Sequence, residues 1–250
     1  MSHHKLEARN LSYAYPDGQE ALKNLSFTVT HGEAVGLIGA NGAGKSTVLA
    51  LLMGLLFPSE GQALLADVAI TKKTLPLVRQ SLGLVMQNPD DQLFMTSVYD
   101  DVAFGPRNYQ LTESEVAARV AGALDLVGIP HLRDRAPYRL SVGEKRCAAI
   151  AAVLSMQPDI LLMDEPTAGL DPQARRRIMN LLNSFSHTKI ITSHDLDMVW
   201  TVCRRVILLK GGTVAADGPA EEILTDARLL ESCGLELPLS LQNCPSGQAR

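Results

Sequence analysis

Nine residues, Gly39 to Thr47, restrict the fold of this chain more than any other part of its sequence. They fit the pattern G-x-x-x-x-G-K-[ST], follow the apolar run Ala34–Ile38 and open an apolar segment that begins at Lys45. A short apolar run without alternation is typical of a strand buried on both faces, so the order is strand, glycine-rich turn, helix. This order predicts an α/β fold in which the turn binds phosphate.

Each part of this turn has a chemical reason to be there. Glycines allow backbone N–H groups to curl around phosphate oxygens, and the helix N-terminus adds a partial positive charge. Lys45 supplies a positive charge for the β- and γ-phosphates, and the Ser46 hydroxyl can ligate Mg²⁺. The residues predicted to contact the nucleotide here are Gly39, Ala40, Asn41, Gly42, Ala43, Gly44, Lys45, Ser46 and Thr47.

A pair of carboxylates follows a second apolar run, Ile160–Met163. Asp164 ends this predicted strand, a position from which a carboxylate can reach Mg²⁺ directly or through water. Glu165 comes next, and we expect it to orient and deprotonate the attacking water as a general base. Taken alone, acids after an apolar strand are common, so this interpretation depends on the phosphate-binding turn.

Length, composition and charge restrict the class of protein that this chain can be. The chain has 250 residues, 46 % hydrophobic and 20 % charged, which suits one globular domain with a core of its own. Its longest apolar run, Val48–Phe57, is about half the length that a bilayer requires, and no secretory signal is evident. The net charge of -4 argues against a nucleic-acid partner. The four cysteines form no C-x-x-C pair, which favours a reducing compartment and predicts no cobalt or nickel site in this chain.

The order of patterns predicts a single domain over residues 6–240, with a core of 6–91 and 158–240. Alternation over 6–29 predicts antiparallel strands, and helices are expected over 45–56, 173–185 and 221–232. Apolar residues at helical spacing over 113–127 predict an amphipathic helix within a helical subdomain at 92–157. Residues 241–250, which contain Pro245 and Gly247, are expected to form a flexible tail.

Several of these segments occur in the order found in ABC ATPases, which the chain resembles over residues 6 to about 230. The resemblance rests on Gly39–Thr47, Gln87, Leu140–Arg146, Met163–Pro166, Ala168–Asp171 and His194. It implies a P-loop NTPase core of α/β class with an N-terminal antiparallel β subdomain and a helical subdomain. It also implies ATP and Mg²⁺ as ligands, ATP hydrolysis as the reaction, and a head-to-tail dimer with a second copy.

The resemblance also assigns roles to individual residues. Tyr15 resembles the aromatic residue that stacks on adenine, with Tyr13 as the rival. Gln87 resembles a glutamine that ligates Mg²⁺ together with Ser46 and Asp164, and that senses a membrane partner. Asp171 resembles an acid that crosses the dimer interface, and His194 a histidine that contacts the γ-phosphate. With Glu165, His194 is the predicted catalytic pair.

The segment Leu140–Arg146 resembles the family's signature loop, in which Ser141 and Gly143 meet the nucleotide bound by the other copy. Ser141 and Glu144 also have the spacing of a capping box, and both roles are compatible. The segment departs from the family at Val142, where glycine is usual. A β-branched residue adds bulk there, so we expect a weaker or slower closed dimer.

Two further stretches are similar to the ATPases of energy-coupling-factor importers: Gln87–Phe94 and Asp100–Pro106. The C-terminal segments Asp217–Pro219, Glu221–Leu224 and Gly234–Pro238 are similar to their cobalt or nickel branch. The resemblance thus implies a peripheral protein at the cytoplasmic face of the membrane, partnered by transmembrane coupling and substrate-binding subunits. A vitamin importer and an ABC ATPase outside transport stay as alternatives, as does a P-loop module without turnover.

Overall fold

The computed structural model describes residues 5–242, and the chain divides into two compact units. One unit comprises residues 1–78 and 187–250, the other residues 79–186. The predicted flexible tail lies outside the described residues from 243 onward, as do His3, His4 and Cys244.

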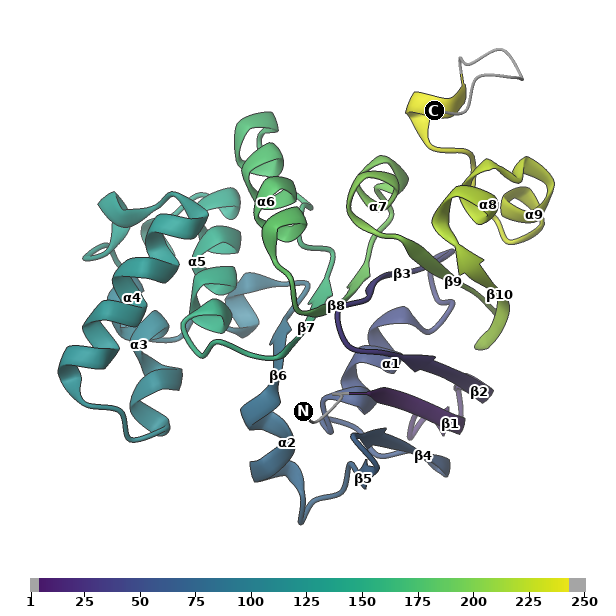
Figure 1. The fold of residues 1–250 in the computed structure, drawn as a ribbon, viewed down its shortest axis with the longest axis horizontal. Helices are drawn as coiled ribbons and strands as arrows, with labels where there is room; N and C mark the ends of the chain where they lie inside the picture. The colour runs from purple at the N-terminus through teal and green to yellow at the C-terminus, as the bar shows by residue number, and fades with distance from the viewer. Residues whose placement is uncertain (1–4, 243–250) are drawn as a thin grey trace. The chain divides into compact units, whose positions relative to one another are not determined.

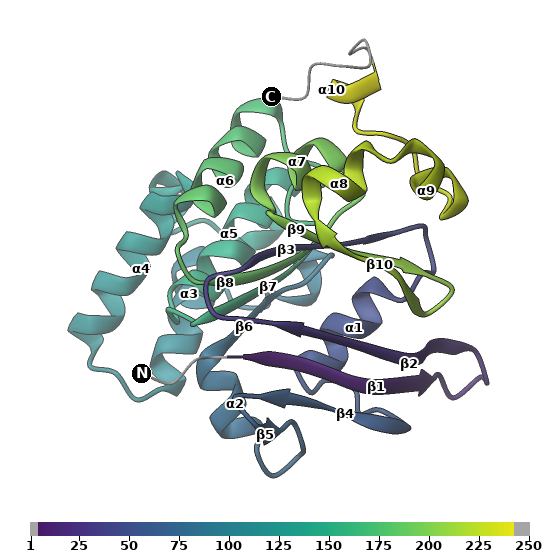
Figure 2. The same cartoon turned by 45° about the vertical axis from the view of Figure 1, so that its right-hand side comes forward.

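In the first unit, an antiparallel sheet has the strand order β2-β1-β4-β5 (Figure 2). Its strands are β1 (Leu6–Ala14), β2 (Glu20–Val29), β4 (Glu60–Leu65) and β5 (Val68–Ala69). The turn between β1 and β2 is closed by the Gly18 N–H, which donates to the Tyr15 carbonyl at 2.9 Å. The antiparallel strands expected over 6–29 are therefore confirmed.

The same unit contains strands in the order β10-β9-β3-β8, of which β3 is parallel to both of its neighbours. Their bounds are β3 (Ala34–Gly39), β8 (Thr188–Thr192), β9 (Arg205–Lys210) and β10 (Thr213–Pro219). Every residue of β3 is buried, as its unbroken apolar run predicts. Because β3 and β8 run parallel, their carboxyl ends lie at the same edge of the sheet.

Helix α1 (Lys45–Leu52) is four residues shorter than the expected helix over 45–56. It ends because Gly54 takes a φ of +66°, a left-handed conformation that glycine adopts without steric cost.

The prediction of one C-terminal helix over 221–232 is wrong in detail. This segment is two helices, α8 (Ala220–Thr225) and α9 (Ala227–Ser232), separated by Asp226, whose side chain accepts from the Leu229 N–H at 3.0 Å and caps α9. Helices α7 (Leu196–Val202) and α10 (Leu239–Gln242) complete this unit.

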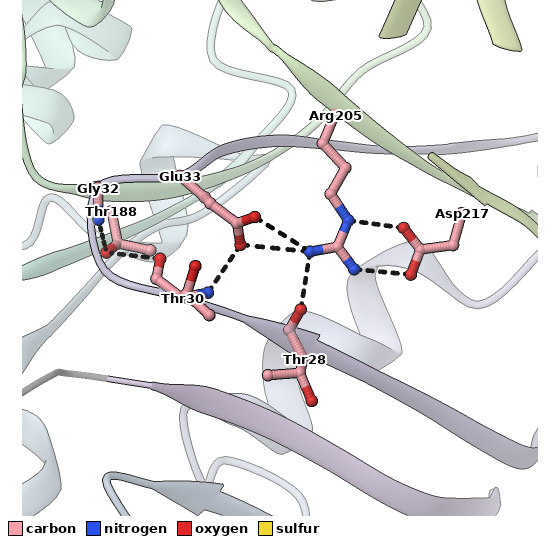
Figure 3. A network of polar contacts seen from close by, with 7 residues as sticks. All are labelled: Thr28, Thr30, Gly32, Glu33, Thr188, Arg205 and Asp217. Atoms are coloured by element: carbon pink, nitrogen blue, oxygen red, sulfur yellow. Dashed lines mark hydrogen bonds and ion pairs between the residues drawn. The ribbon is translucent and has the colours of Figure 1, made fainter. Parts of the chain in front are cut away.

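An arginine at the start of β9 fixes the turn between β2 and β3 (Figure 3). The Arg205 guanidinium donates to both Asp217 carboxylate oxygens, at 2.6 and 2.7 Å, and to the Thr28 carbonyl at 2.9 Å. It also donates to Glu33, and the Gly32 N–H donates to the Thr188 hydroxyl at 2.9 Å. Asp217 raises the pKa of Arg205 further above its usual value. These bonds hold the entry to β3 and hence the strand that leads into the glycine-rich turn.

The second unit contains the parallel strands β6 (Leu82–Val85) and β7 (Ile160–Asp164), together with four longer helices. Helices α3 (Val98–Asn108), α4 (Glu113–Val127) and α5 (Val142–Leu154) lie side by side (Figure 1), and α6 (Pro172–Ser184) contacts α4. The boundary between the units falls within α2 (Leu75–Ser81). The amphipathic helix predicted over 113–127 is confirmed, with a Thr112–Glu115 capping box at its start and Gly128 at its end.

Candidate functional site

The glycine-rich turn joins β3 to α1 and depends on glycine for its shape. Gly39, Gly42 and Gly44 all have positive φ angles, of 155°, 77° and 102°. A Cβ at Gly39 would lie 2.6 Å from the Leu209 carbonyl oxygen, and one at Gly44 would lie 2.9 Å from the Ala21 carbonyl oxygen. Around Gly42 there is open space. The turn is therefore pressed against its own unit on one side and open on the other, as a phosphate cradle requires.

Lys45 places a cation inside this turn. Its side chain is buried, 7 % exposed, and its Nζ donates to the carbonyl oxygens of Gly39 at 2.7 Å and Ala40 at 3.1 Å. The N-cap residue of α1 is Gly44, so no side chain caps this helix, and its first turn contains no acidic residue. The first turn of α1 thus contains a lysine ammonium and no acidic residue, and the helix dipole adds partial positive charge there.

Tyr15 lies next to this turn. Its hydroxyl is 2.9 Å from the Thr47 hydroxyl, and its ring meets the Tyr13 ring edge to face at 5.1 Å. Tyr15 is exposed at 36 %, whereas Tyr13 is half-buried. The sequence did not reveal the Tyr15–Thr47 contact, because Tyr15 lies in the turn after β1 whereas Thr47 lies on α1.

His194 lies at the same sheet edge as the glycine-rich turn. Thr192, the last residue of β8, pairs in register with Leu37 of β3. His194 and Gly39 are therefore each two residues beyond a matched pair of parallel strands. His194 is exposed. This edge of the first unit carries Tyr15, the glycine-rich turn and His194 together.

The second unit has its own edge of polar side chains, at the carboxyl ends of β6 and β7. Val85 pairs in register with Met163, so Gln87 and Glu165 each lie two residues beyond that pair. Asp164 and Glu165 are buried, whereas Gln87 is exposed. Glu165 has a φ of +50°, a conformation that costs a residue with a side chain of order 1 kcal/mol or more. Such strain is concentrated at functional sites, and neither residue type nor spacing revealed it in the sequence.

The N-terminus of α5 is capped by its own side chains. The Ser141 hydroxyl accepts from the Glu144 N–H at 3.3 Å, and the Glu144 carboxylate accepts from the Ser141 N–H at 2.7 Å, so the predicted capping box is confirmed. These bonds from Ser141 hold the pKa of the Glu144 carboxyl below its usual value. Val142 is 60 % exposed, and Gly143 lies beside the Gly169–Leu170 segment.

Asp171 has a local role that the sequence interpretation did not include. It is the N-cap of α6, and its carboxylate accepts from the Gln173 N–H at 2.8 Å and the Ala174 N–H at 2.9 Å. The signal was present in the sequence, since Asp followed by Pro172 at the first helical position is a helix start. Asp171 is exposed, so its predicted contact with a second copy stays a prediction.

Over residues 5–242, no group of three or more His, Cys, Asp or Glu side chains is arranged to hold a metal ion. None of the helices in that range is long and apolar enough to cross a membrane.

Residues 22–168 match the model of the ABC transporter family. A putative ABC transporter ATP-binding protein of Geobacter sulfurreducens is 58 % identical over 98 % of both chains. An energy-coupling factor transporter ATP-binding protein of Methanothermobacter thermautotrophicus is 45 % identical over 93 % of this chain and 76 % of its own length.

Two solved structures resemble the fold. CbiO1 from Clostridium perfringens, part of the ABC transporter complex CbiONQ, is 40 % identical with a TM-score of 0.79 and covers 94 % of this chain and 96 % of its own. A dimeric ATP-binding cassette in a post-hydrolysis state, bound to ADP and phosphate, is 26 % identical with a TM-score of 0.80, covering 86 % of this chain and 98 % of its own.

Proposed function

The chain belongs to the ABC transporter family as an ATP-binding subunit, and from that premise we propose that it hydrolyses ATP to power an importer of the energy-coupling-factor class that carries cobalt or nickel ions. The observation that carries the ATPase proposal is the uncapped start of α1. Gly44 gives that helix no side-chain cap, the turn before it is open at Gly42, and the Lys45 ammonium is held against the loop. A nucleotide phosphate is the anion that this arrangement suits.

Each predicted site residue then has a role. The N–H groups and Lys45 bind the phosphates, and Tyr15 stacks on adenine, a role supported by its bond to Thr47. Ser46, Gln87 and Asp164 offer hydroxyl, amide and carboxylate oxygens, the ligand types that suit Mg²⁺. When bound, Mg²⁺ neutralises charge on the phosphate oxygens. Glu165 takes the proton of the attacking water, and His194 orients that water and the γ-phosphate.

A second copy completes the proposed site. Ser141 and Gly143 of one copy donate to the γ-phosphate held by the other, and Asp171 lies at the interface between the copies. Support comes from the exposure of Ser141 and Asp171 and from the dimeric relative bound to ADP and phosphate. The capping box does not exclude this role, because a hydroxyl that accepts from the Glu144 N–H can rotate its proton toward a phosphate oxygen.

An aromatic surface supports a membrane partner beside the Gln87 segment. Phe94 is 63 % exposed, and its ring meets the Phe104 ring edge to face at 5.0 Å. The N–H groups of Phe94 and Met95 both donate to Asp101, which fixes the segment after Gln87 on α3. We place the coupling subunit here, with the chain peripheral at the cytoplasmic face of the membrane.

The proposed importer class and the proposed transported ion rest on different support. The class is supported by relatives with the energy-coupling-factor name and by CbiO1 as a structural neighbour. The cargo is supported only by the resemblance of the segments at 217–224 and 234–238. A vitamin importer of the same class is the alternative, followed by an ABC ATPase outside transport.

Three assays test the proposal. Phosphate release by the purified full chain should need both Mg²⁺ and ATP and should fall by about 10²–10³ in Lys45→Ala. Co-expression with candidate membrane subunits should give uptake of labelled Co²⁺ or Ni²⁺, whereas vitamin uptake would select the alternative. Phe94→Ala should weaken co-purification with the membrane subunits. Leu126→Ala, which removes another exposed apolar side chain, on α4, should not. Absence of all phosphate release would contradict the ATPase proposal itself.

A further inference from the structure

Arg146 is a buried cation near the start of α5. Its side chain is 4 % exposed, and its Nη1 donates to the Met86 carbonyl oxygen at 3.4 Å. Among the residues that the structure describes, no acceptor lies within hydrogen-bonding distance of its Nε. A buried charge with so few hydrogen bonds costs folding free energy unless nearby charges compensate for it.

The compensating charges lie at the end of β7. Burial lowers the pKa of Arg146, whereas Glu165 and then Asp164 attract the guanidinium and act in the opposite direction. All three residues belong to the second unit. The charges of the two carboxylates assigned above to water activation and to Mg²⁺ therefore act on the buried guanidinium.

Met86 is held from both sides by side chains tied to α5. Its N–H donates to the Gln92 side-chain oxygen at 3.1 Å, and the Gln92 side-chain nitrogen donates to the Ala149 carbonyl of α5 at 2.8 Å. Its carbonyl accepts from Arg146. Met86 directly precedes Gln87, so the residue before Gln87 is fixed to the helix that begins at Ser141.

We propose that Arg146 is a positioning residue whose buried guanidinium ties the backbone at Met86 to helix α5 and attracts the carboxylates of Asp164 and Glu165. This proposal rests on the proposed ATPase function. It means that movement of α5 against a second copy's nucleotide would shift Glu165 and the Gln87 segment together. Arg146 touches no phosphate in this account and acts through the residues it positions.

Steady-state ATP hydrolysis by the full chain tests this role. Arg146→Met should lower kcat about 10- to 100-fold, the cost of misplacing a catalytic group by about 1 Å, with KM for ATP changed less than about threefold. Arg146→Lys keeps the charge and should recover part of that loss. Arg119→Met is the matched control, because Arg119 on α4 also donates to backbone carbonyls at 3.4 Å in this unit. It should keep the wild-type kcat.

Each outcome either supports or overturns the proposed role of Arg146. A folded Arg146→Met variant with wild-type kcat overturns the proposal, as does a lysine variant that is as slow as the methionine variant. If Arg146→Met does not fold, Arg146→Lys decides: reduced kcat at an unchanged Tm supports the role, and wild-type kcat overturns it. A wild-type chain that does not hydrolyse ATP would instead contradict the proposed function. An active wild type beside an equally active Arg146→Met variant would contradict only the role of Arg146.

Discussion

Two helix N-termini in this molecule are both assigned to phosphate, yet they are built in opposite ways. Helix α1 begins at Gly44 with no side-chain cap and with Lys45 held against the loop before it. Helix α5 begins at Ser141 with a complete capping box. No side chain caps the N–H groups of the first terminus, whereas the second is capped by its own Ser141 and Glu144. We infer that nucleotide binds firmly at α1 and meets α5 only when a second copy brings it there.

The largest expected effect comes from trapping nucleotide between the α1 terminus of one copy and the α5 terminus of another. Glu165→Gln keeps the side-chain shape and removes the base, so turnover should fall by roughly 10²–10⁴ while ATP still binds. The variant should elute as an ATP-bound dimer in gel filtration. Glu231→Gln, exposed on α9, is the control and should hydrolyse ATP normally. Near-normal hydrolysis by Glu165→Gln would show that another group activates the water.

Lys45→Ala tests the α1 side of the comparison. The change removes the charge held by the Gly39 and Ala40 carbonyls, so turnover should fall by about 10²–10³ and ATP affinity should fall with it. Lys210→Ala, exposed at the end of β9, serves as the control. Isothermal titration with ATP measures the affinity, and an unchanged titration would contradict the phosphate assignment of the turn.

The capping box at α5 makes a prediction about stability and not about nucleotide binding. Ser141→Ala should lower the free energy of unfolding by about 1 kcal/mol, with ATP affinity of the isolated chain unchanged. The measurement is urea denaturation alongside an ATP titration. A loss of ATP affinity in the monomer would mean that α5 contacts nucleotide before any second copy arrives.

Glu144 gives this terminus a pH dependence. Because the folded-state pKa of Glu144 lies below its unfolded value of about 4.3, its charge stabilises the fold above that pH and ceases to do so as the pH falls through the folded-state pKa. The stability gap between the wild type and Glu144→Gln should thus be present at pH 7 and close in acid. A gap that is constant from pH 7 to pH 3 would contradict this account.

The smallest expected effect is at Val142. Its side chain is exposed and lies close to Gly169, where an added Cβ would come within 3.2 Å of it. Val142→Gly should raise basal hydrolysis if the side chain obstructs the closed dimer, at a cost of up to about 1 kcal/mol in stability. Val142→Ala should hydrolyse ATP at a basal rate between those of the wild type and Val142→Gly. Unchanged activity in a folded glycine variant would mean that the valine fits the closed interface.

The sequence predicted the features that depend on local chemistry. The glycine-rich turn, the capping box at Ser141 and the strand before Asp164 all follow from residue type at fixed spacing. The break at Asp226 was missed because an internal cap competed with an otherwise continuous helical pattern. The bonds of Arg205 were not predictable, since they join residues up to 177 positions apart.

Hydrogen exchange on Glu165→Gln, with and without Mg²⁺ and ATP, tests the contrast between the two helix termini most directly. Below the concentration at which the dimer forms, ATP should slow exchange at the first-turn amides of α1 and leave those at the start of α5 unchanged. Above that concentration, the amides that follow Ser141 should become protected as well. Equal protection of both termini in the monomer, or none at α1, would contradict the account.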